Sequence, residues 1–95
     1  MTRYRKKPVV IEAWQLGGGK PMPQWLNEAI ETHGVTAFPR SHGGISSMVI
    51  ATLEGSLVAS LGSWIIRGVK GELYPCDDEI FRMTYDEERG DIVDA

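Results

Sequence analysis

The sequence predicts an α+β fold. An antiparallel sheet of four to six strands, with a β-meander in the C-terminal half, carries one main helix on a face and a short helix near the C-terminus. Short apolar runs separated by glycines fill residues 48–74, apolar residues recur every three or four positions over residues 23–33, and a Pro-Cys-Asp-Asp sequence at residues 75–78 opens a further helix. The length of 95 residues fits one domain, predicted over residues 1–85, followed by an acidic flexible tail over residues 86–95.

The first predicted element is a strand over residues 8–16. Alternation puts apolar side chains on both of its faces, which is typical of an interior strand covered from two sides. Glu12 interrupts this pattern, and we expect it at a rim or in an ion pair with a lysine or arginine. The three glycines at residues 17–19 end the strand. The Gly-Gly-Gly-Lys run lacks the spacing of a phosphate-binding loop, so none is expected there.

The second predicted element is a helix over residues 23–33. Gly34 is expected to end it in the left-handed conformation, and the His33 side chain is expected to interact with the negative end of the helix, although a role as ligand or base is the alternative. The apolar stripe, which should lie across one face of the sheet, consists of Met22, Trp25, Leu26, Ala29, Ile30 and His33.

The middle of the chain predicts a short strand, a loop and a hairpin. Residues 35–38 should form a strand that stops at Pro39, because proline lacks a backbone donor. The polar, glycine-rich stretch 40–47 is expected to be a mobile loop. A tight hairpin follows, with strands over residues 48–53 and 56–61 around a two-residue loop of Glu54 and Gly55.

Two further strands, over residues 64–67 and 72–74, flank a Gly-Val-Lys-Gly turn and should continue the meander. Pro75 is expected to end the last strand, and Asp77 or Asp78 is expected to cap a helix that runs to Met83. The predicted core is drawn from all these elements and consists of Val9, Ile11, Trp14, Leu26, Ile30, Val49, Leu57, Ile65, Ile66 and Phe81.

Charge is distributed unevenly along the chain. The net charge is −3, yet residues 1–40 carry six basic and three acidic side chains, whereas residues 41–95 carry four basic and ten acidic ones. General nucleic-acid binding is not expected, because it needs a clustered excess of lysine and arginine. The basic N-terminus is expected to be a solubilising lead-in that pairs with acidic surface of the same or a neighbouring chain, with a local anion site as the alternative.

The lack of a second cysteine, of a long apolar run and of a signal-peptide pattern bears on the cellular location. Cys76 is the only cysteine, so no internal disulfide can form, and no apolar run approaches the roughly 20 residues of a membrane span. The basic N-terminus leads into too short an apolar segment to suggest a signal peptide. We therefore expect an intracellular protein without membrane association. Cys76 itself is expected to be a buried structural residue, with a reactive thiol near the helix start as the alternative.

Two segments, RYRKKPVVIEAWQL at residues 3–16 and LEGSLVASLGSWIIRGVKGELYPCDDEIFRMTY at residues 53–85, carry a family resemblance. The chain resembles small, mostly uncharacterised proteins of tailed bacteriophages and prophages that open with Y-R-K-K-P-V-V-I-E-A and close with a G-D-[WY]-I-I-[RK]-G-V-K-G-E-F-Y-P-C run. Ser63 and Leu73 depart from the Asp and Phe usual in that family. The resemblance implies a phage or prophage origin and a place in the bacterial host cytoplasm, but no catalytic residues.

Three classes of function remain open. The first is a non-enzymatic binding or accessory protein that modulates a host enzyme or defence pathway. A structural or virion-associated phage protein is the second. An enzyme that uses some combination of His33, His42, Cys76 and Glu12 is the third, and it would require the side chains involved to converge. We predict the first class, with no cofactor and no metal, and a homo-oligomer formed through a sheet edge because small sheets leave open edges.

The predicted ligand or partner site lies at the Gly-Val-Lys-Gly turn. Guanidinium and ammonium groups next to an aromatic ring suit a host protein or a small anionic, partly planar ligand. The alternative is that Arg67 and Lys70 are solvated turn residues that pair with Glu72 or Asp77. The residues predicted for this site are Arg67, Lys70, Glu72 and Tyr74, joined by Arg5 and Lys6 if the first strand pairs nearby.

Overall fold

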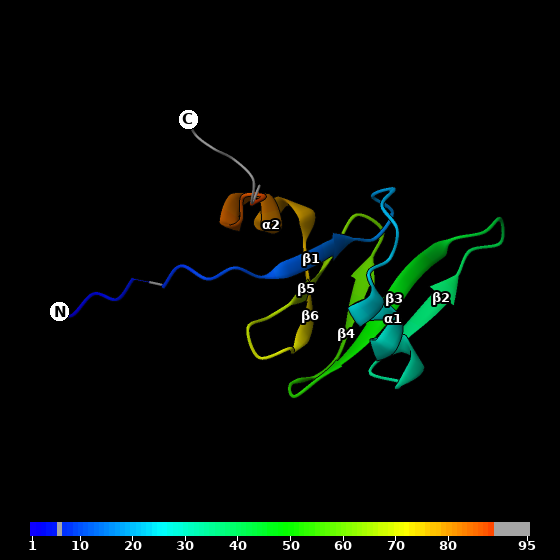
Figure 1. Cartoon of the computed structure of the whole chain (residues 1–95), viewed down its shortest axis with the longest axis horizontal. Coiled ribbons are helices and arrows are strands. Elements are labelled where there is room, and N and C mark those ends of the chain that lie inside the picture. Colours follow the sequence, from blue (N-terminus) through cyan, green and yellow to red (C-terminus); the bar gives the residue numbers. More distant parts are fainter. Residues whose placement is uncertain (6, 89–95) are drawn as a thin grey trace.

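A computed structural model of the protein describes residues 1–5 and 7–88. It has two three-stranded antiparallel sheets and two helices (Figure 1), which confirms the predicted α+β class with a main helix and a short C-terminal helix. No helix in this described part of the chain is long and apolar enough to cross a membrane. In chain order the elements are β1 (Glu12–Gln15), α1 (Gln24–Glu31), β2 (Val35–Pro39), β3 (Ile45–Thr52), β4 (Gly55–Ser60), β5 (Trp64–Arg67), β6 (Leu73–Cys76) and α2 (Asp78–Thr84).

The six strands are divided between two sheets. The first sheet has the order β1-β5-β6 and the second has the order β2-β3-β4, so the C-terminal meander is interrupted between β4 and β5. The segment that connects β4 to β5 explains why these two strands do not pair. Leu16 donates its N–H to Ser63 O at 2.9 Å and accepts the N–H of Gly62 at 2.8 Å. These two bonds hold the chain beside the end of β1, so β5 pairs with β1 instead of β4.

The prediction of an interior first strand is wrong. β1 spans only residues 12–15 and lies at the edge of its sheet. Its first residue, Glu12, pairs with Arg67, the last residue of β5, and the chain turns away at Gly68. Residues 8–11 therefore find no partner in the described chain, and Val9 and Val10 are 45% and 67% exposed.

The hairpin of β3 and β4 is shifted by one residue from the prediction. Thr52 pairs with Gly55, so the loop residues are Leu53 and Glu54. The Thr52 hydroxyl donates to Gly55 O at 2.7 Å and accepts the N–H of Glu54 at 3.1 Å, while Gly55 takes the positive φ of 111°. β3 also begins at Ile45, so residues 45–47 belong to a strand and not to the predicted loop.

The first sheet separates two apolar layers. Ile65 on one face joins the main core between the sheets and under α1, and the residues buried there are Leu16, Leu26, Val35, Met48, Ile50, Ala59 and Ile65. Ile66 and Trp64 lie on the opposite face, because neighbouring residues of a strand alternate. There the Trp64 ring stacks on Phe81 of α2 with centroids 4.0 Å apart.

The predicted core is partly right. Leu26, Ile65 and Ile66 are fully buried. Five others are only half-buried, namely Ile11, Trp14, Ile30, Val49 and Phe81. Val9 is wrong because β1 starts after it, and Leu57 is wrong because it lies close to the turn of the β3–β4 hairpin and is 37% exposed. Met48 and Ile50 fill the core face of β3 in place of Val49, which alternation puts on the other face.

α1 ends at Glu31, two residues earlier than predicted. His33, not Gly34, adopts the left-handed conformation, with φ 67°. Gly34 donates to Ala29 O at 2.9 Å and His33 donates to Ile30 O at 3.1 Å. These two bonds form the Schellman arrangement that closes helix C-termini. His33 is consequently exposed and does not belong to the buried stripe.

The last two elements agree with the prediction except at Pro75. Pro75 lies inside β6 and pairs in register with Ile65, so it does not end the strand. A proline is tolerated there because β6 is an edge strand. Asp77 caps α2 as predicted, since its side chain accepts the N–H of Glu79 at 3.2 Å.

We predict that Leu26→Ala destabilises the protein by about 2–5 kcal/mol, because the side chain is fully buried and its loss leaves a cavity. Urea denaturation followed by circular dichroism measures the change. Asn27→Ala, on the exposed side of α1, is the control. An unchanged denaturation midpoint for Leu26→Ala would show that α1 does not pack as described.

His33→Gly should stabilise the protein by about 0.5–1 kcal/mol. Glycine removes the steric cost of a left-handed residue at this helix end, and the greater flexibility of the unfolded chain offsets part of the gain. His33→Ala keeps the Cβ atom and should give no such gain. Equal melting temperatures for the glycine and alanine variants would contradict the strained-backbone interpretation.

Candidate functional site

The structure places Arg67 in an ion pair across the first sheet. Arg67 Nη1 lies 2.9 Å from Glu12 Oε1, and the two side chains are 43% and 60% exposed. The expectation of an ion pair for Glu12 is thereby confirmed, whereas the alternative considered for Arg67 paired it with Glu72 or Asp77. Solvent screens such an exposed pair, so it adds little to stability.

Glu72 holds the Gly-Val-Lys-Gly turn together. Its Oε1 accepts the backbone N–H of Lys70 at 2.9 Å, and its carbonyl accepts the N–H of Gly68 at 2.8 Å. The carboxylate lies where a Cβ atom on Gly68 would clash with it, so glycine at this position lets the acid fold over the turn. Lys70 is exposed at the tip.

Tyr74, the aromatic member of the predicted site, interacts with Tyr85, which lies outside that site. Burial raises the pKa of Tyr74 to about 12, reinforced by a side-chain hydrogen bond to Tyr85 and by the charges of Tyr85 and Glu72. The phenol therefore stays protonated over the whole physiological range. It links β6 to the segment that follows α2.

The six predicted residues do not share one cavity. Glu72 and Tyr74 line a cavity of about 600 Å³ beside the β3–β4 hairpin, together with Leu53, Glu54 and Leu57. Its charged lining residues are both acids, which does not favour the anionic ligand expected there. Arg67, Lys70 and Arg5 line neither this cavity nor the next one, and Lys6 lies outside the described residues.

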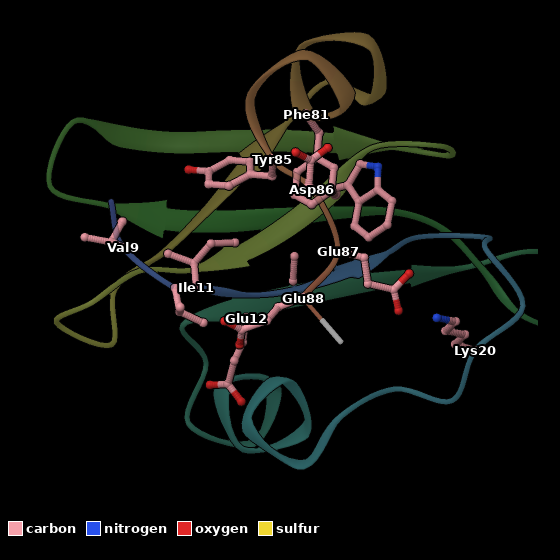
Figure 2. Close-up of a pocket in the computed structure, with 12 residues that line it drawn as sticks. Val9, Ile11, Glu12, Lys20, Phe81, Tyr85, Asp86, Glu87 and Glu88 are labelled. Carbon is pink, nitrogen blue, oxygen red and sulfur yellow. The ribbon is translucent and has the colours of Figure 1, made fainter. Parts of the chain in front are cut away.

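A second cavity, here called the aromatic cavity, has a volume of about 540 Å³ and lies between the N-terminal segment and the chain after α2. Figure 2 shows Phe81 and Tyr85 above residues 9–12, with the chain from Tyr85 to Glu88 crossing β1. The Tyr85 ring lies 5.1 Å from Phe81, which in turn stacks on Trp64. The full lining is Val9, Val10, Ile11, Glu12, Ala13, Lys20, Trp64, Phe81, Tyr85, Asp86, Glu87 and Glu88.

The charges of the aromatic cavity favour a cation. Four of its lining residues, Glu12, Asp86, Glu87 and Glu88, carry carboxylates, and Lys20 is the one basic residue in the lining. The Glu12 carboxylate already pairs with Arg67, so the excess of negative charge comes from the three acids that follow α2. Aromatic rings also attract cations electrostatically, and more strongly where water is excluded. The cavity thus combines aromatic walls with an acidic rim.

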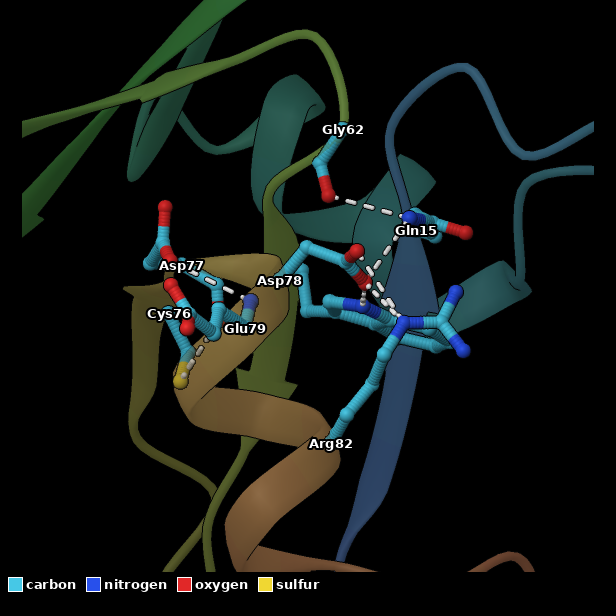
Figure 3. Close-up of polar contacts among 8 residues, drawn as sticks. Gln15, Gly62, Cys76, Asp77, Asp78, Glu79 and Arg82 are labelled. Carbon is cyan, nitrogen blue, oxygen red and sulfur yellow. Dashed lines mark hydrogen bonds and ion pairs between the residues drawn. The ribbon is translucent and has the colours of Figure 1, made fainter.

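The Asp78 carboxylate fixes one wall of this cavity (Figure 3). Its Oδ1 accepts hydrogen bonds from Trp64 Nε1 at 2.8 Å, Arg82 Nε at 2.9 Å and Gln15 Nε2 at 3.2 Å. Gln15 Nε2 also donates to the carbonyl of Gly62 at 3.0 Å. Hydrogen bonds from Trp64, and then from Arg82, lower the pKa of the Asp78 carboxyl. The indole ring is thereby oriented against Phe81.

Sequence reasoning missed this network. It identified Asp78 only as a helix-capping candidate and had no role for Gln15. One signal was present: Asp78 and Arg82 are four residues apart on a predicted helix, a spacing that favours an ion pair. The bonds to Gln15 and Trp64, which are 63 and 14 residues away in sequence, leave no such local signal.

The residues considered for catalysis lie on separate elements. His33 follows α1, His42 lies between β2 and β3, and Cys76 ends β6. Glu12 lines the aromatic cavity, but none of the other three lines either cavity. Burial, and then the charge of Asp77, raise the pKa of the half-buried Cys76 thiol, which makes it a poorer nucleophile.

The Asp78 network should make stability fall at acid pH. Because the folded state lowers the carboxyl pKa below its ordinary value of 3.8, the contribution is present above that value and lost as the pH falls through the folded-state pKa. Asp78→Asn should be less stable than the wild type at pH 7, and the difference should shrink towards pH 2. Melting temperatures from pH 2 to pH 7 measure it, with Glu31→Gln as the control. A pH-independent difference would refute the proposed charge dependence.

Comparison with models of known protein families, with curated proteins and with solved structures finds no match for this chain. The resemblance to small tailed-phage proteins therefore remains a prediction. What the site can do must be inferred from its own geometry.

Proposed function

We propose that the chain is a non-catalytic binding protein that accepts a positively charged segment of a partner protein in the aromatic cavity. The observation that supports this proposal best is the combination, in one cavity, of the Trp64, Phe81 and Tyr85 rings with four carboxylates. Lysine and arginine side chains suit such a site, because their aliphatic stems pack on apolar surface and their charged heads reach the rim.

The size and position of the cavity favour a segment of chain over a small molecule. Its volume of about 540 Å³ lies within the range of ligand sites, but its rim is formed by an extended strand and an extended C-terminal segment. β1 is an edge strand among the described elements, so an extended peptide can pair with its outer side. An added peptide strand gains affinity from backbone hydrogen bonds and specificity from alternate side chains.

The family resemblance suggests where the chain acts and which kind of partner it binds. A chain of tailed-phage or prophage origin would act in the host cytoplasm, and its partner would be a host enzyme or defence protein that presents a basic segment. The motifs at residues 3–16 and 53–85 support this origin. They contain Glu12, Trp64, Phe81 and Tyr85, which line the cavity.

Isothermal titration calorimetry with a lysine-rich peptide tests the proposal. We expect binding that weakens as salt is added, and we expect Glu87→Gln with Glu88→Gln to reduce affinity by roughly three- to tenfold, because each exposed charge pair contributes modestly. Glu28→Gln with Glu31→Gln, two exposed carboxylates of α1, is the matched control and should leave affinity unchanged.

Two results would argue against this function. Equal binding of a glutamate-rich peptide would show that charge does not select the ligand. Equal effects of the rim and control variants would show that binding depends only on net charge and not on the aromatic cavity.

A further inference from the structure

The described residues of the N-terminal arm, which is defined as residues 1–11, lead away from the sheets in Figure 1. Its described residues form no strand, yet it carries exposed apolar side chains: Tyr4 is 92% exposed and Val10 is 67% exposed. Val9, Val10 and Ile11 are β-branched and favour an extended, paired backbone. The arm is therefore a strand-forming segment without a partner strand in the described chain.

An open sheet edge continues directly from this arm. β1 pairs with β5 on one side only, so its other side leaves backbone groups unpaired within the described structure. Such an edge is a template for another strand. Arm and edge together form one extended stretch from residue 8 to residue 15.

We infer that a second copy of the chain covers this stretch. The two arms pair antiparallel about a two-fold axis near Val10, and each arm runs along β1 of the other copy, past its aromatic cavity. This inference rests on the proposed function, because both treat the aromatic cavity as a site for cations. It adds the identity of the segment that fills the cavity when no partner protein is bound.

Charge complementarity supports this occupant. The arm carries Arg3, Arg5, Lys6 and Lys7 and no acidic residue. The rim of the cavity carries the carboxylates of Glu12, Asp86, Glu87 and Glu88. Antiparallel pairing centred on Val10 sets Lys7 opposite Ala13 and Arg5 opposite Gln15. The basic side chains of one copy then lie beside the acidic rim of the other.

Occupation by the arm of the same copy is disfavoured. The arm would have to reverse between residues 7 and 11, where Pro8 is followed by Val9, Val10 and Ile11. Pro8 can begin a turn, but the three β-branched residues that follow it favour an extended backbone, and the run contains no Gly, Asn or Asp to complete a tight reversal. Exchange between two copies requires no turn, because each arm stays extended, as its described residues are in Figure 1.

A charge-swap experiment tests the exchange in the full-length chain. Arg3→Glu, Arg5→Glu and Lys7→Glu make the arm-reversed variant, and Asp86→Lys, Glu87→Lys and Glu88→Lys make the rim-reversed variant. Sedimentation velocity should show a wild-type dimer and at least roughly tenfold weaker association of each variant alone. An equimolar mixture should recover the dimer, because both arm-to-rim contacts are again attractive. Wild-type association of either variant alone, or no recovery on mixing, overturns the inference.

A disulfide trap tests the register. In a Cys76→Ser background, Val10→Cys should give a covalent dimer on oxidation, because residues opposite each other at a two-fold axis lie within disulfide reach. Leu53→Cys, fully exposed at the hairpin tip, is the control and should form little covalent dimer. Equal cross-linking of the two variants overturns the register.

The two proposals fail in different ways. If the wild type is monomeric but binds the lysine-rich peptide, the exchange is wrong and the cavity function stands. If the arm-reversed variant dissociates but binds no peptide, the cavity function is wrong although the arms pair. If both are right, the arm-reversed variant binds the peptide more tightly than the wild type, because its own arms no longer compete.

Discussion

The carboxylate of Asp78 is the contact on which the C-terminal half of the structure depends. It joins donors from β1, β5 and α2, and so connects the last helix to the first strand. α2 contains no fully buried residue among those described, so burial alone holds it weakly. The network and the stacking of Phe81 on Trp64 supply the missing attachment, and the aromatic cavity lies beneath them.

The short first sheet explains why this attachment is needed. Its strands are four residues long, and it must separate two apolar layers. The layer between the sheets contains nearly all the fully buried side chains, whereas the layer under α2 is half-buried and aromatic. A chain of 95 residues cannot fill two deep cores. The thinner layer consequently leaves a cavity and open edges.

The fold brings the basic and the acidic ends of the chain to the same strand. The basic N-terminal arm leads into β1 at Glu12, and the acidic residues that follow α2 cross β1. The carboxylates of the acidic end of the chain thus gather beside the strand into which the basic arm leads. The site expected at the Gly-Val-Lys-Gly turn has no comparable convergence, because Glu72 bonds the turn itself and Arg67 pairs with Glu12.

The sequence by itself determined the local elements. The glycines at residues 17–19, the helical period after Pro23 and the Asp77 cap each act over a few residues, so α1, β5 and α2 could be placed within one to two residues of their ends. Only the tertiary structure decided how the strands are shared between sheets and where a site forms. The bonds of Leu16 to Gly62 and Ser63, and of Gln15 to Asp78, join segments 46 to 63 residues apart. Such pairings depend on chain topology, which hydrophobic periodicity and capping signals do not specify.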